Sequence, residues 1–230
     1  IKFDDRVKMA VLRRDQVIAT RPMRPIGRTG AAATAKHVIE TRVTKQPVAI
    51  LTLGLVGAGK TTFLHYVEKV SGRSFFDQSV EKPKAHWLYI DFRNFSKSIS
   101  PRDYIYDALL EYINKNATLG DFKKTIDGAY ADEIASLKRG PLAVLAGDEK
   151  AVERHIADLV IGEYKEKIPY VRRILKYVAL KTPVFLVVDN VDQHEDQNTQ
   201  EEIFLEAVAA ARELKANLVL AMRDATYVTN

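Results

Sequence analysis

The sequence contains no cysteine among its 230 residues. This absence excludes disulfide bonds, thiolate metal sites and a cysteine nucleophile, and it is compatible with a reducing cytosol, so we expect a cytoplasmic location. Long apolar runs are also lacking, because the longest, residues 183–188, falls far short of the ~20 residues that a membrane helix needs. We therefore expect no membrane contact in this segment. The histidines are scattered without metal-ligand spacing, so we also expect no zinc site.

The chain is long enough for one large domain, and 47% hydrophobic with 28% charged residues is typical of a soluble globular protein. Its net charge of +5 is unevenly placed, because residues 1–47 carry 11 Lys and Arg against 4 Asp and Glu. We expect residues 1–30 to form a basic arm or linker and residues 31–230 to form the folded core. Such an arm suits nucleic acid, anionic lipid or an acidic partner, and a solvated linker equally.

Segments with strand patterns alternate with segments of helical spacing along the core. This alternation predicts an α/β fold with three layers (α/β/α), in which helices cover both faces of a mostly parallel sheet. The stretch 117–180 is expected to be mostly helical, with a break near Gly140 and Gly147. The expected strands are residues 48–53, 87–92, 184–188 and 218–222, and the other expected helices are residues 31–45, 60–70, 101–114 and 199–216.

A glycine-rich stretch between the first core strand and its helix matches G-x-x-x-x-G-K-[ST], through Gly54 and Gly59-Lys60-Thr61. Glycines let backbone N–H groups turn inward around phosphates, and a helix N-terminus favours the same negative charge. Lys60 is expected to reach the β- and γ-phosphates, and the Thr61 hydroxyl to bind Mg²⁺. The full set expected to contact a nucleotide is Gly54, Val56, Gly57, Ala58, Gly59, Lys60, Thr61 and Thr62.

A second motif follows the apolar strand at residues 184–188, which closes on Asp189. Ligands of open α/β sheets bind at this edge, so Asp189 is expected to hold Mg²⁺ directly or through water. Many ATPases carry glutamate at the next position, but here it is Asn190, whose amide can orient water and cannot accept its proton. Asp192 is the next candidate for positioning or deprotonating water, and Glu195 comes after it. The alternative is that each is a solvated acidic residue in a loop. We therefore predict slow hydrolysis, or a site that mostly holds nucleotide.

These features, in this order, resemble the STAND branch of the AAA+ superfamily of P-loop NTPases, which includes the NB-ARC regulators; origin-recognition-type ATPases look similar. The resemblance covers roughly residues 26–224 and makes residues 117–180 a helical insertion before the Walker B strand. It implies that Ile26, Gly27 and Arg28 line an adenine pocket, unless they are an ordinary turn. It also implies that Arg223 senses the γ-phosphate, unless it is a surface residue. A helical lid, sensor 2 and an arginine finger are expected outside this chain.

The expected function is that of an ATP·Mg²⁺-dependent switch domain in a larger regulatory protein, with other domains of that protein and a homo-oligomer as partners. The alternative is a nucleic-acid-associated motor or loader that uses residues 1–30 as a contact. A third interpretation is a small-molecule kinase, although no substrate lid is identifiable. Asp91 and Arg93 lie at the end of the second core strand, where they either approach the nucleotide or form an ion pair that supports the fold.

Overall fold

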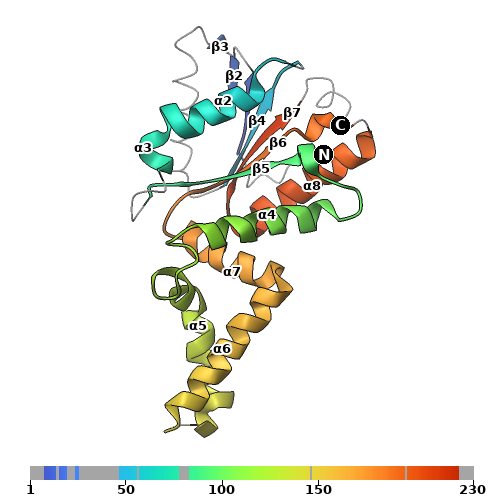
Figure 1. Ribbon diagram of the computed structural model, residues 1–230. Coiled ribbons are helices and arrows are strands. Elements are labelled where there is room, and N and C mark those ends of the chain that lie inside the picture. Colours follow the sequence, from blue (N-terminus) through green and yellow to red (C-terminus); the bar gives the residue numbers. More distant parts are fainter. Residues whose placement is uncertain are drawn as a thin grey trace. The chain divides into compact units, whose positions relative to one another are not determined.

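The computed structural model describes residues 8–13, 16–19, 24–25, 47–55, 57–77, 83–145, 147–194 and 196–222, with side chains described from residue 47 onward. The chain forms two compact units. The first unit combines Ile1–Ile105 with Thr182–Asn230, and the second is Tyr106–Lys181 (Figure 1). The second unit is thus an insertion between two strands of the first.

A seven-stranded sheet forms the first unit, in the order β3-β2-β1-β4-β7-β6-β5. Strand β1 and strands β4 to β7 pair in parallel, whereas β2 and β3 are antiparallel, so the expectation of a mostly parallel sheet is confirmed. Strand β7 lies between β4 and β6, and therefore separates the strand before the glycine-rich loop from the strand that ends at Asp189. The strands are β1 (Lys8–Arg13), β2 (Gln16–Ala19), β3 (Arg24–Pro25), β4 (Val48–Leu53), β5 (His86–Asp91), β6 (Val184–Asp189) and β7 (Asn217–Met222).

The segment expected to be a basic arm contributes to this sheet where it is described. Strand β1 pairs with β4 along its whole length, from Lys8 opposite Val48 to Arg13 opposite Leu53. Because β1 covers the free side of β4, the strand that leads into the glycine-rich loop is an interior strand of the sheet. The helix expected at residues 31–45 lies outside the described residues.

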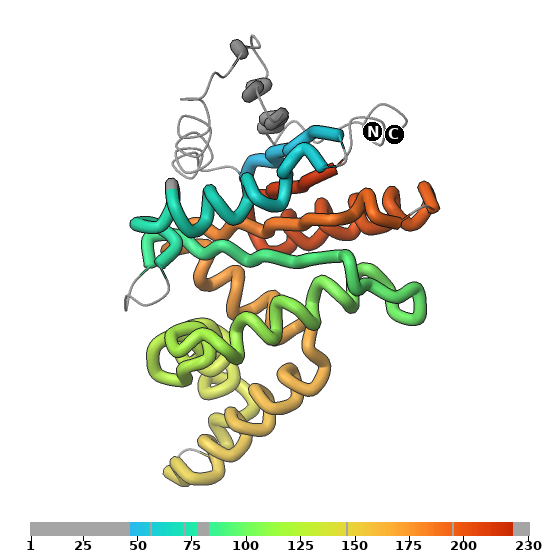
Figure 2. The backbone as a smooth tube through the Cα atoms, turned by 45° about the horizontal axis from the view of Figure 1, so that its top comes forward, coloured from blue at the N-terminus to red at the C-terminus, as the bar shows by residue number. Residues whose placement is uncertain are grey.

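Helices cover both faces of the sheet, which is compatible with the expected three-layer arrangement (Figures 1 and 2). Helix α2 (Lys60–Tyr66) continues as the π-helix η2 (Val67–Ser71) and is followed by α3 (Arg73–Phe76). Alternate strand residues pack against these helices, because successive side chains of a strand point to opposite faces. This cluster contains Val48, Ile50, Leu64, Val67, Phe76, Trp87, Phe185, Val187, Val219 and Ala221.

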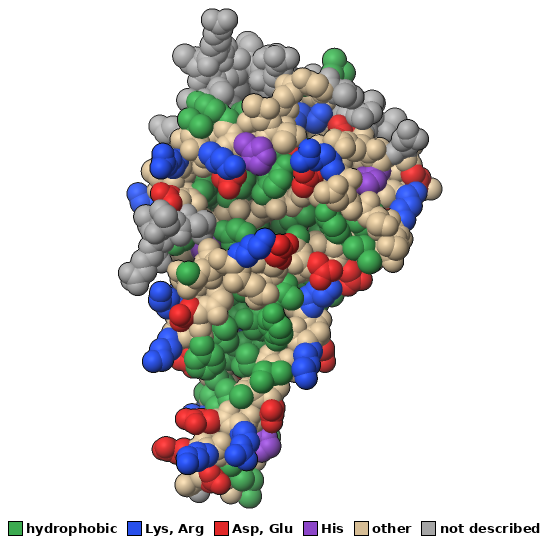
Figure 3. Space-filling view, in the orientation of Figure 1, with side chains coloured by type: hydrophobic (Ala, Val, Ile, Leu, Met, Phe, Trp, Pro, Cys, Tyr) green, Lys and Arg blue, Asp and Glu red, His purple; other side chains and the backbone are tan. Residues whose placement is uncertain are grey.

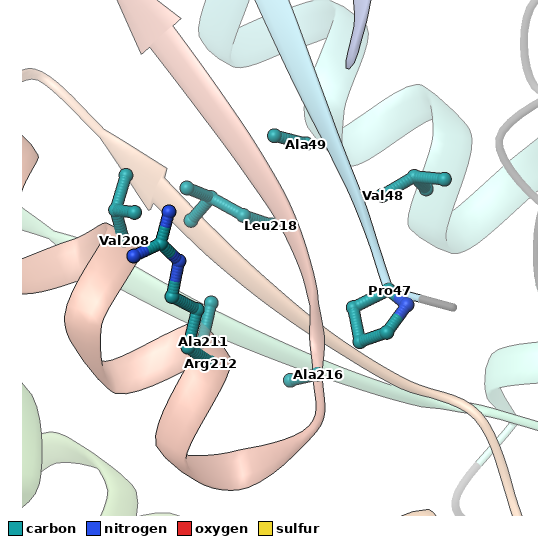
Figure 4. Close-up of a pocket in the computed structure, with 8 residues that line it drawn as sticks. All are labelled: Pro47, Val48, Ala49, Val208, Ala211, Arg212, Ala216 and Leu218. Carbon is teal, nitrogen blue, oxygen red and sulfur yellow. The ribbon is translucent and has the colours of Figure 1, made fainter. Parts of the chain in front are cut away.

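Helix α8 (Gln197–Leu214) packs on the opposite face through an apolar stripe that includes Ile203, Ala207 and Leu214. A crevice of about 20 Å³ remains between α8 and the first residues of β4 and β7, lined by Val208 and Ala211 from α8 and by Ala49 and Leu218 from the strands (Figure 4). It has room for about one water molecule. It also lies at the amino ends of the strands, so it is remote from the edge that the glycine-rich loop occupies.

The second unit is helical, as the sequence predicts, and its helices break between residues 140 and 148. It contains most of α4 (Pro101–Lys115), then η4 (Phe122–Ile126), α5 (Asp127–Arg139), η5 (Pro141–Leu145), α6 (Glu149–Glu166) and α7 (Ile168–Ala179). The Arg173 guanidinium lies 4.6 Å from the Tyr130 ring, and both side chains bond to Glu163, which ties α5, α6 and α7 together. Hydrophobic side chains gather over these helices on the face shown in Figure 3.

The observed elements match the expected ones closely in the described core. The four core strands and the helices expected at residues 101–114 and 199–216 begin and end within two residues of their expected bounds, whereas the helix expected at residues 60–70 is α-helical only to Tyr66 and continues as the π-helix η2. Two short turns, η3 (Phe92–Asn94) and η6 (Val191–Gln193), follow β5 and β6. Among the described residues, no helix combines the length and apolar character needed to cross a membrane.

Candidate functional site

The glycine-rich loop joins the end of β4 to the start of α2. Gly57 and Gly59 have φ angles of 74° and 80°, in the left-handed region that residues with a Cβ rarely adopt. A Cβ at either position would meet nothing within 4 Å, so the requirement for glycine there is conformational and not steric. At Gly54 the reason differs, since a Cβ would lie 3.1 Å from the Ala58 Cβ. The loop therefore requires glycine at these positions to adopt its backbone conformation.

Lys60, the first residue of α2, turns its side chain back into this loop. Its Nζ donates to the carbonyl oxygen of Gly54 at 2.9 Å and to that of Leu55 at 3.3 Å. The same Nζ lies 3.2 Å from Oδ2 of Asp192. An ammonium has three N–H groups, so these three acceptors can use all of them. The structure thus brings Lys60 and Asp192 together, as two candidate residues predicted from separate motifs.

Asp189 ends β6, and its side chain is only 1% exposed. Its Oδ1 accepts a hydrogen bond from the backbone N–H of Asn190 at 2.8 Å, and its Oδ2 accepts one from the Tyr89 hydroxyl at 2.8 Å. Each carboxylate oxygen has two acceptor sites, so these bonds fix the orientation of the group and leave acceptor capacity on both oxygens. Burial, followed by the hydrogen bond to Asp189, raises the pKa of Tyr89 well above its ordinary value, so the hydroxyl remains a donor.

Asn190 has φ 62° and ψ 23°, the left-handed conformation that asparagine tolerates better than most residues. Its Nδ2 donates to Oδ1 of Asp91 at 2.8 Å, and its Oδ1 accepts from Nε2 of Gln193 at 3.0 Å. The side chain is only 8% exposed. In this structure the amide links the ends of β5 and β6, so the sharp turn and this link account for asparagine at this position.

Asp91 and Arg93 form the ion pair that the sequence analysis gave as one interpretation. The Arg93 guanidinium lies 2.5 Å from Oδ2 of Asp91, and the Arg93 backbone N–H donates to Oδ1. Burial alone would raise the pKa of Asp91, but hydrogen bonds from Arg93 and Asn190 outweigh it and lower the pKa below its ordinary value. Asp91 is therefore a charged anchor that holds Asn190.

Tyr89, an aromatic residue bonded to Asp189, was not predicted as part of the site from the sequence. Tyr89 supplies the hydroxyl to Asp189, and its ring centroid lies 4.9 Å from that of His65 on α2. A clue was available in the parallel pairing of β5 with β6, in which Tyr89 lies opposite Val187 and Asp91 lies opposite Asp189. Tyr89 and Asp91 share one face of β5, so an acid ending the neighbouring strand lies within reach of both.

Other predicted site residues have different outcomes. Thr61 and Ala58 are half-buried and Thr62 is exposed, at the start of α2 and in the loop before it. Val56, Glu195, Arg223 and the Ile26-Gly27-Arg28 element lie outside the described residues, so their predicted roles stay predictions. Strand β7 ends at Met222, whose carbonyl oxygen accepts a hydrogen bond from the N–H of Gly54 at 3.3 Å. The end of β7 is thus tied to the start of the loop.

The described residues contain no group of three or more His, Cys, Asp or Glu side chains arranged to hold a metal ion. Mg²⁺ does not need such a group, because proteins commonly hold it through one or two carboxylates together with substrate phosphates. Asp189, with acceptor capacity on both oxygens, and the hydroxyl of Thr61 are suitable ligands of this kind. Their donor types fit a hard cation that arrives with a nucleotide.

Comparison of the chain with models of protein families, with curated proteins and with solved structures returned no match. A functional assignment therefore depends on the loop, its neighbouring acids and the resemblance in motif order.

Proposed function

We propose that the first unit binds ATP·Mg²⁺ at the carboxyl edge of its sheet and acts as a slowly hydrolysing nucleotide switch of the P-loop type. The observation that carries this proposal is the loop between β4 and α2, where Gly57 and Gly59 are left-handed and Lys60 is directed inward. A loop of this sequence and path cradles phosphates with its backbone N–H groups. Asp189, at the same edge, supports the assignment with a carboxylate suited to Mg²⁺.

Each residue has a distinct role in this proposal. Lys60 supplies a positive charge to the β- and γ-phosphates, and the loop backbone donates hydrogen bonds to their oxygens. Thr61 and Asp189 hold Mg²⁺, which, when bound, neutralises charge on the phosphate oxygens. Tyr89 and the Asn190 N–H keep the Asp189 carboxylate in one orientation. Arg223 is proposed as the γ-phosphate sensor on the strength of the AAA+/STAND resemblance.

We propose adenine as the base on two grounds. The resemblance implies that Ile26, Gly27 and Arg28 form an adenine pocket, and the sequence has no obvious N-K-x-D motif for reading guanine. A direct competition experiment tests the choice: ATP should displace a bound fluorescent nucleotide at much lower concentration than GTP. Equal displacement by both nucleotides would contradict the adenine assignment and leave the phosphate site unaffected.

Slow turnover follows from the residues that surround the γ-phosphate position in this proposal. The amide of Asn190 cannot accept a proton and is already engaged with Asp91 and Gln193. Steady-state ATP turnover measured as phosphate release should therefore be slow, and a rate typical of fast ATPases would contradict this part of the proposal.

The metal role is tested by nucleotide binding with Mg²⁺ and with EDTA. Asp189→Asn and Thr61→Ala should weaken binding in Mg²⁺ by about tenfold or more, since each removes a ligand worth at least about 1.4 kcal/mol, and should change little in EDTA. Thr62→Ala is the control for metal dependence, because Thr62 is expected to contact the nucleotide but not the metal, so any loss of affinity should be equal in Mg²⁺ and in EDTA. Equal effects of Asp189→Asn in Mg²⁺ and in EDTA would contradict the metal assignment.

The alternative function, a nucleic-acid motor or loader, depends on the basic N-terminal segment. Because β1 pairs with β4, deleting residues 1–30 would also uncover the β4 edge, so charge removal is the cleaner test. If this segment contacts DNA, binding should fall steeply with salt, and the slope should decrease when its arginines are replaced. The replacements are Arg21→Gln and Arg24→Gln, which leave the proposed adenine pocket intact. DNA binding whose salt dependence does not change in these variants would exclude the segment as the contact.

A further inference from the structure

The ammonium of Lys60 is fully occupied by acceptors from two sources. Two of them, the carbonyl oxygens of Gly54 and Leu55, belong to the loop and are neutral. The third is the carboxylate of Asp192, at 3.2 Å, which belongs to the turn η6 after β6. A phosphate oxygen that bonds to this ammonium must replace at least one of these three acceptors.

Burial makes the carboxylate a strong competitor. The side chain of Lys60 is 11% exposed and that of Asp192 is 7% exposed, so water screens this pair much less than an exposed ion pair. The loop carbonyls are covalently part of the cradle and move only with it. The carboxylate is on a separate element, and it carries the same sign of charge as the phosphate that would approach it. It is therefore the acceptor that the phosphate replaces.

We propose that Asp192 competes with the nucleotide phosphates for Lys60, so that nucleotide binding requires an exchange of the Lys60 ion pair from Asp192 to phosphate. This inference rests on the proposed nucleotide function and adds a determinant of affinity to it. The exchange ends the contact between the Asp192 carboxylate and Lys60 only when phosphate is present in the loop. Asp192 therefore links phosphate binding in the loop to a change in the turn after β6.

The position of Asp192 in the chain supports transmission of this change. Asp192 lies in a one-turn 3₁₀ helix between Asn190, which is bonded to Asp91, and His194, whose Nε2 lies 2.9 Å from the carbonyl oxygen of Phe92. These contacts connect the two ends of η6 to the last residue of β5 and to the first residue of η3. A change at Asp192 therefore acts on a short turn whose two ends are held against β5 and η3.

The exchange also predicts a dependence on divalent cation. Once Lys60 bonds to phosphate, the Asp192 carboxylate remains near a triphosphate, which adds like-charge repulsion. A bound Mg²⁺ offsets part of that negative charge. Asp192 should therefore penalise the metal-free nucleotide more than ATP·Mg²⁺, which makes the site selective for the metal complex.

The test is equilibrium binding of ATP, in EDTA and in Mg²⁺, to wild type and to Asp192→Asn. The substitution keeps the shape of the side chain and removes its charge, so affinity in EDTA should rise by about fivefold or more, with a smaller rise in Mg²⁺. Glu213→Gln is the matched control, because Glu213 forms a half-buried ion pair with Arg102 at 3.0 Å and is remote from the loop in sequence. It should leave ATP affinity unchanged in both conditions.

A second background shows that the effect passes through Lys60. In Lys60→Met protein, adding Asp192→Asn should raise affinity in EDTA less than it does in wild type, because direct repulsion is still relieved but competition for Lys60 is already absent. Asp192→Ala is the second variant, should Asp192→Asn fail to fold, and must raise affinity in EDTA likewise. If wild type binds ATP through Lys60 but neither Asp192 variant binds ATP more tightly in EDTA, this inference is wrong and the proposed function stands. If wild type binds no ATP, the proposed function itself fails.

Discussion

Asn190 offers the sharpest test of how the two acidic strand ends are held together. Its backbone is left-handed at φ 62°, and its amide joins Asp91 to Gln193 from an almost fully buried position. Three substitutions separate these features. Asn190→Ala removes the amide and adds strain, Asn190→Gly removes the amide without strain, and Asn190→Asp keeps the shape but places a second carboxylate beside that of Asp91.

The magnitudes follow from the bonds that are lost. A hydrogen bond to a charged acceptor contributes about 1.5–3 kcal/mol and a neutral one about 0.5–1.5 kcal/mol. Arg93 still bonds to Asp91 in the variants, so we expect the lower end, about 2 kcal/mol, for Asn190→Gly. Asn190→Ala adds about 1 kcal/mol of left-handed strain, for a total of about 3 kcal/mol. Asn190→Asp should be destabilised at pH 7, and its deficit should shrink as acid protonates one of the two carboxylates.

Urea unfolding followed by tryptophan fluorescence measures these differences. Trp87 is the only tryptophan, is 3% exposed and lies on β5, so its emission reports on the first unit. The order of stability should be wild type, Asn190→Gly, then Asn190→Ala. If Asn190→Ala is as stable as Asn190→Gly, the left-handed turn is not a constraint in solution. If both cost less than about 0.5 kcal/mol, the amide does not carry the link between β5 and β6.

Two further predictions concern β5. Tyr89→Phe removes the hydroxyl that orients Asp189, so it should weaken ATP binding in Mg²⁺ by a few-fold to about tenfold and leave binding in EDTA unchanged. The control is Tyr104→Phe, which loses a bond to the Asp91 carbonyl oxygen and should show no such metal dependence. Equal behaviour of the two variants would refute the role of Tyr89. Burial lowers the pKa of His86 from 6.5 to about 4. The folded state therefore binds fewer protons than the unfolded state in that window, and His86 contributes stability above pH 6.5 that is lost as pH falls towards 4. His86→Gln should reduce the pH dependence of the unfolding free energy between these values by up to about 1.4 kcal/mol per pH unit, and an unchanged slope would show that His86 is not buried in its neutral form.

Local patterns were sufficient to predict most of the core. The apolar run of residues 48–53 followed by glycines, and the run of residues 184–188 that ends in an acid, predict buried strands whose carboxyl ends bear polar groups, and both are observed. Each of these patterns involves residues that are close together in the sequence. Strand order is different, because the placement of β7 between β4 and β6 depends on pairing between distant segments.

The contacts of the site were predicted less well, for a related reason. The bond from Tyr89 to Asp189 joins residues 100 positions apart, and that from Asn190 to Asp91 joins residues 99 positions apart. Both hydrogen bonds depend on the register of β5 against β6, which the sequences of these two strands do not specify by themselves. Asn190 was predicted to be near water because of the residue that it replaces. That role stays a prediction, and the structure places Asn190 in a left-handed turn, a conformation that apolar periodicity does not reveal.

Binding of ATP to the loop is the central claim, and Lys60 tests it most directly. Calorimetric titration of ATP in Mg²⁺ should detect binding to wild type that Lys60→Ala weakens at least about tenfold, because charge-assisted hydrogen bonds contribute about 1.5–3 kcal/mol each. Lys69→Ala is the matched control, since Lys69 is exposed on the same continuous helical segment, and it should bind as wild type does. Undiminished binding of ATP to Lys60→Ala protein would contradict the account.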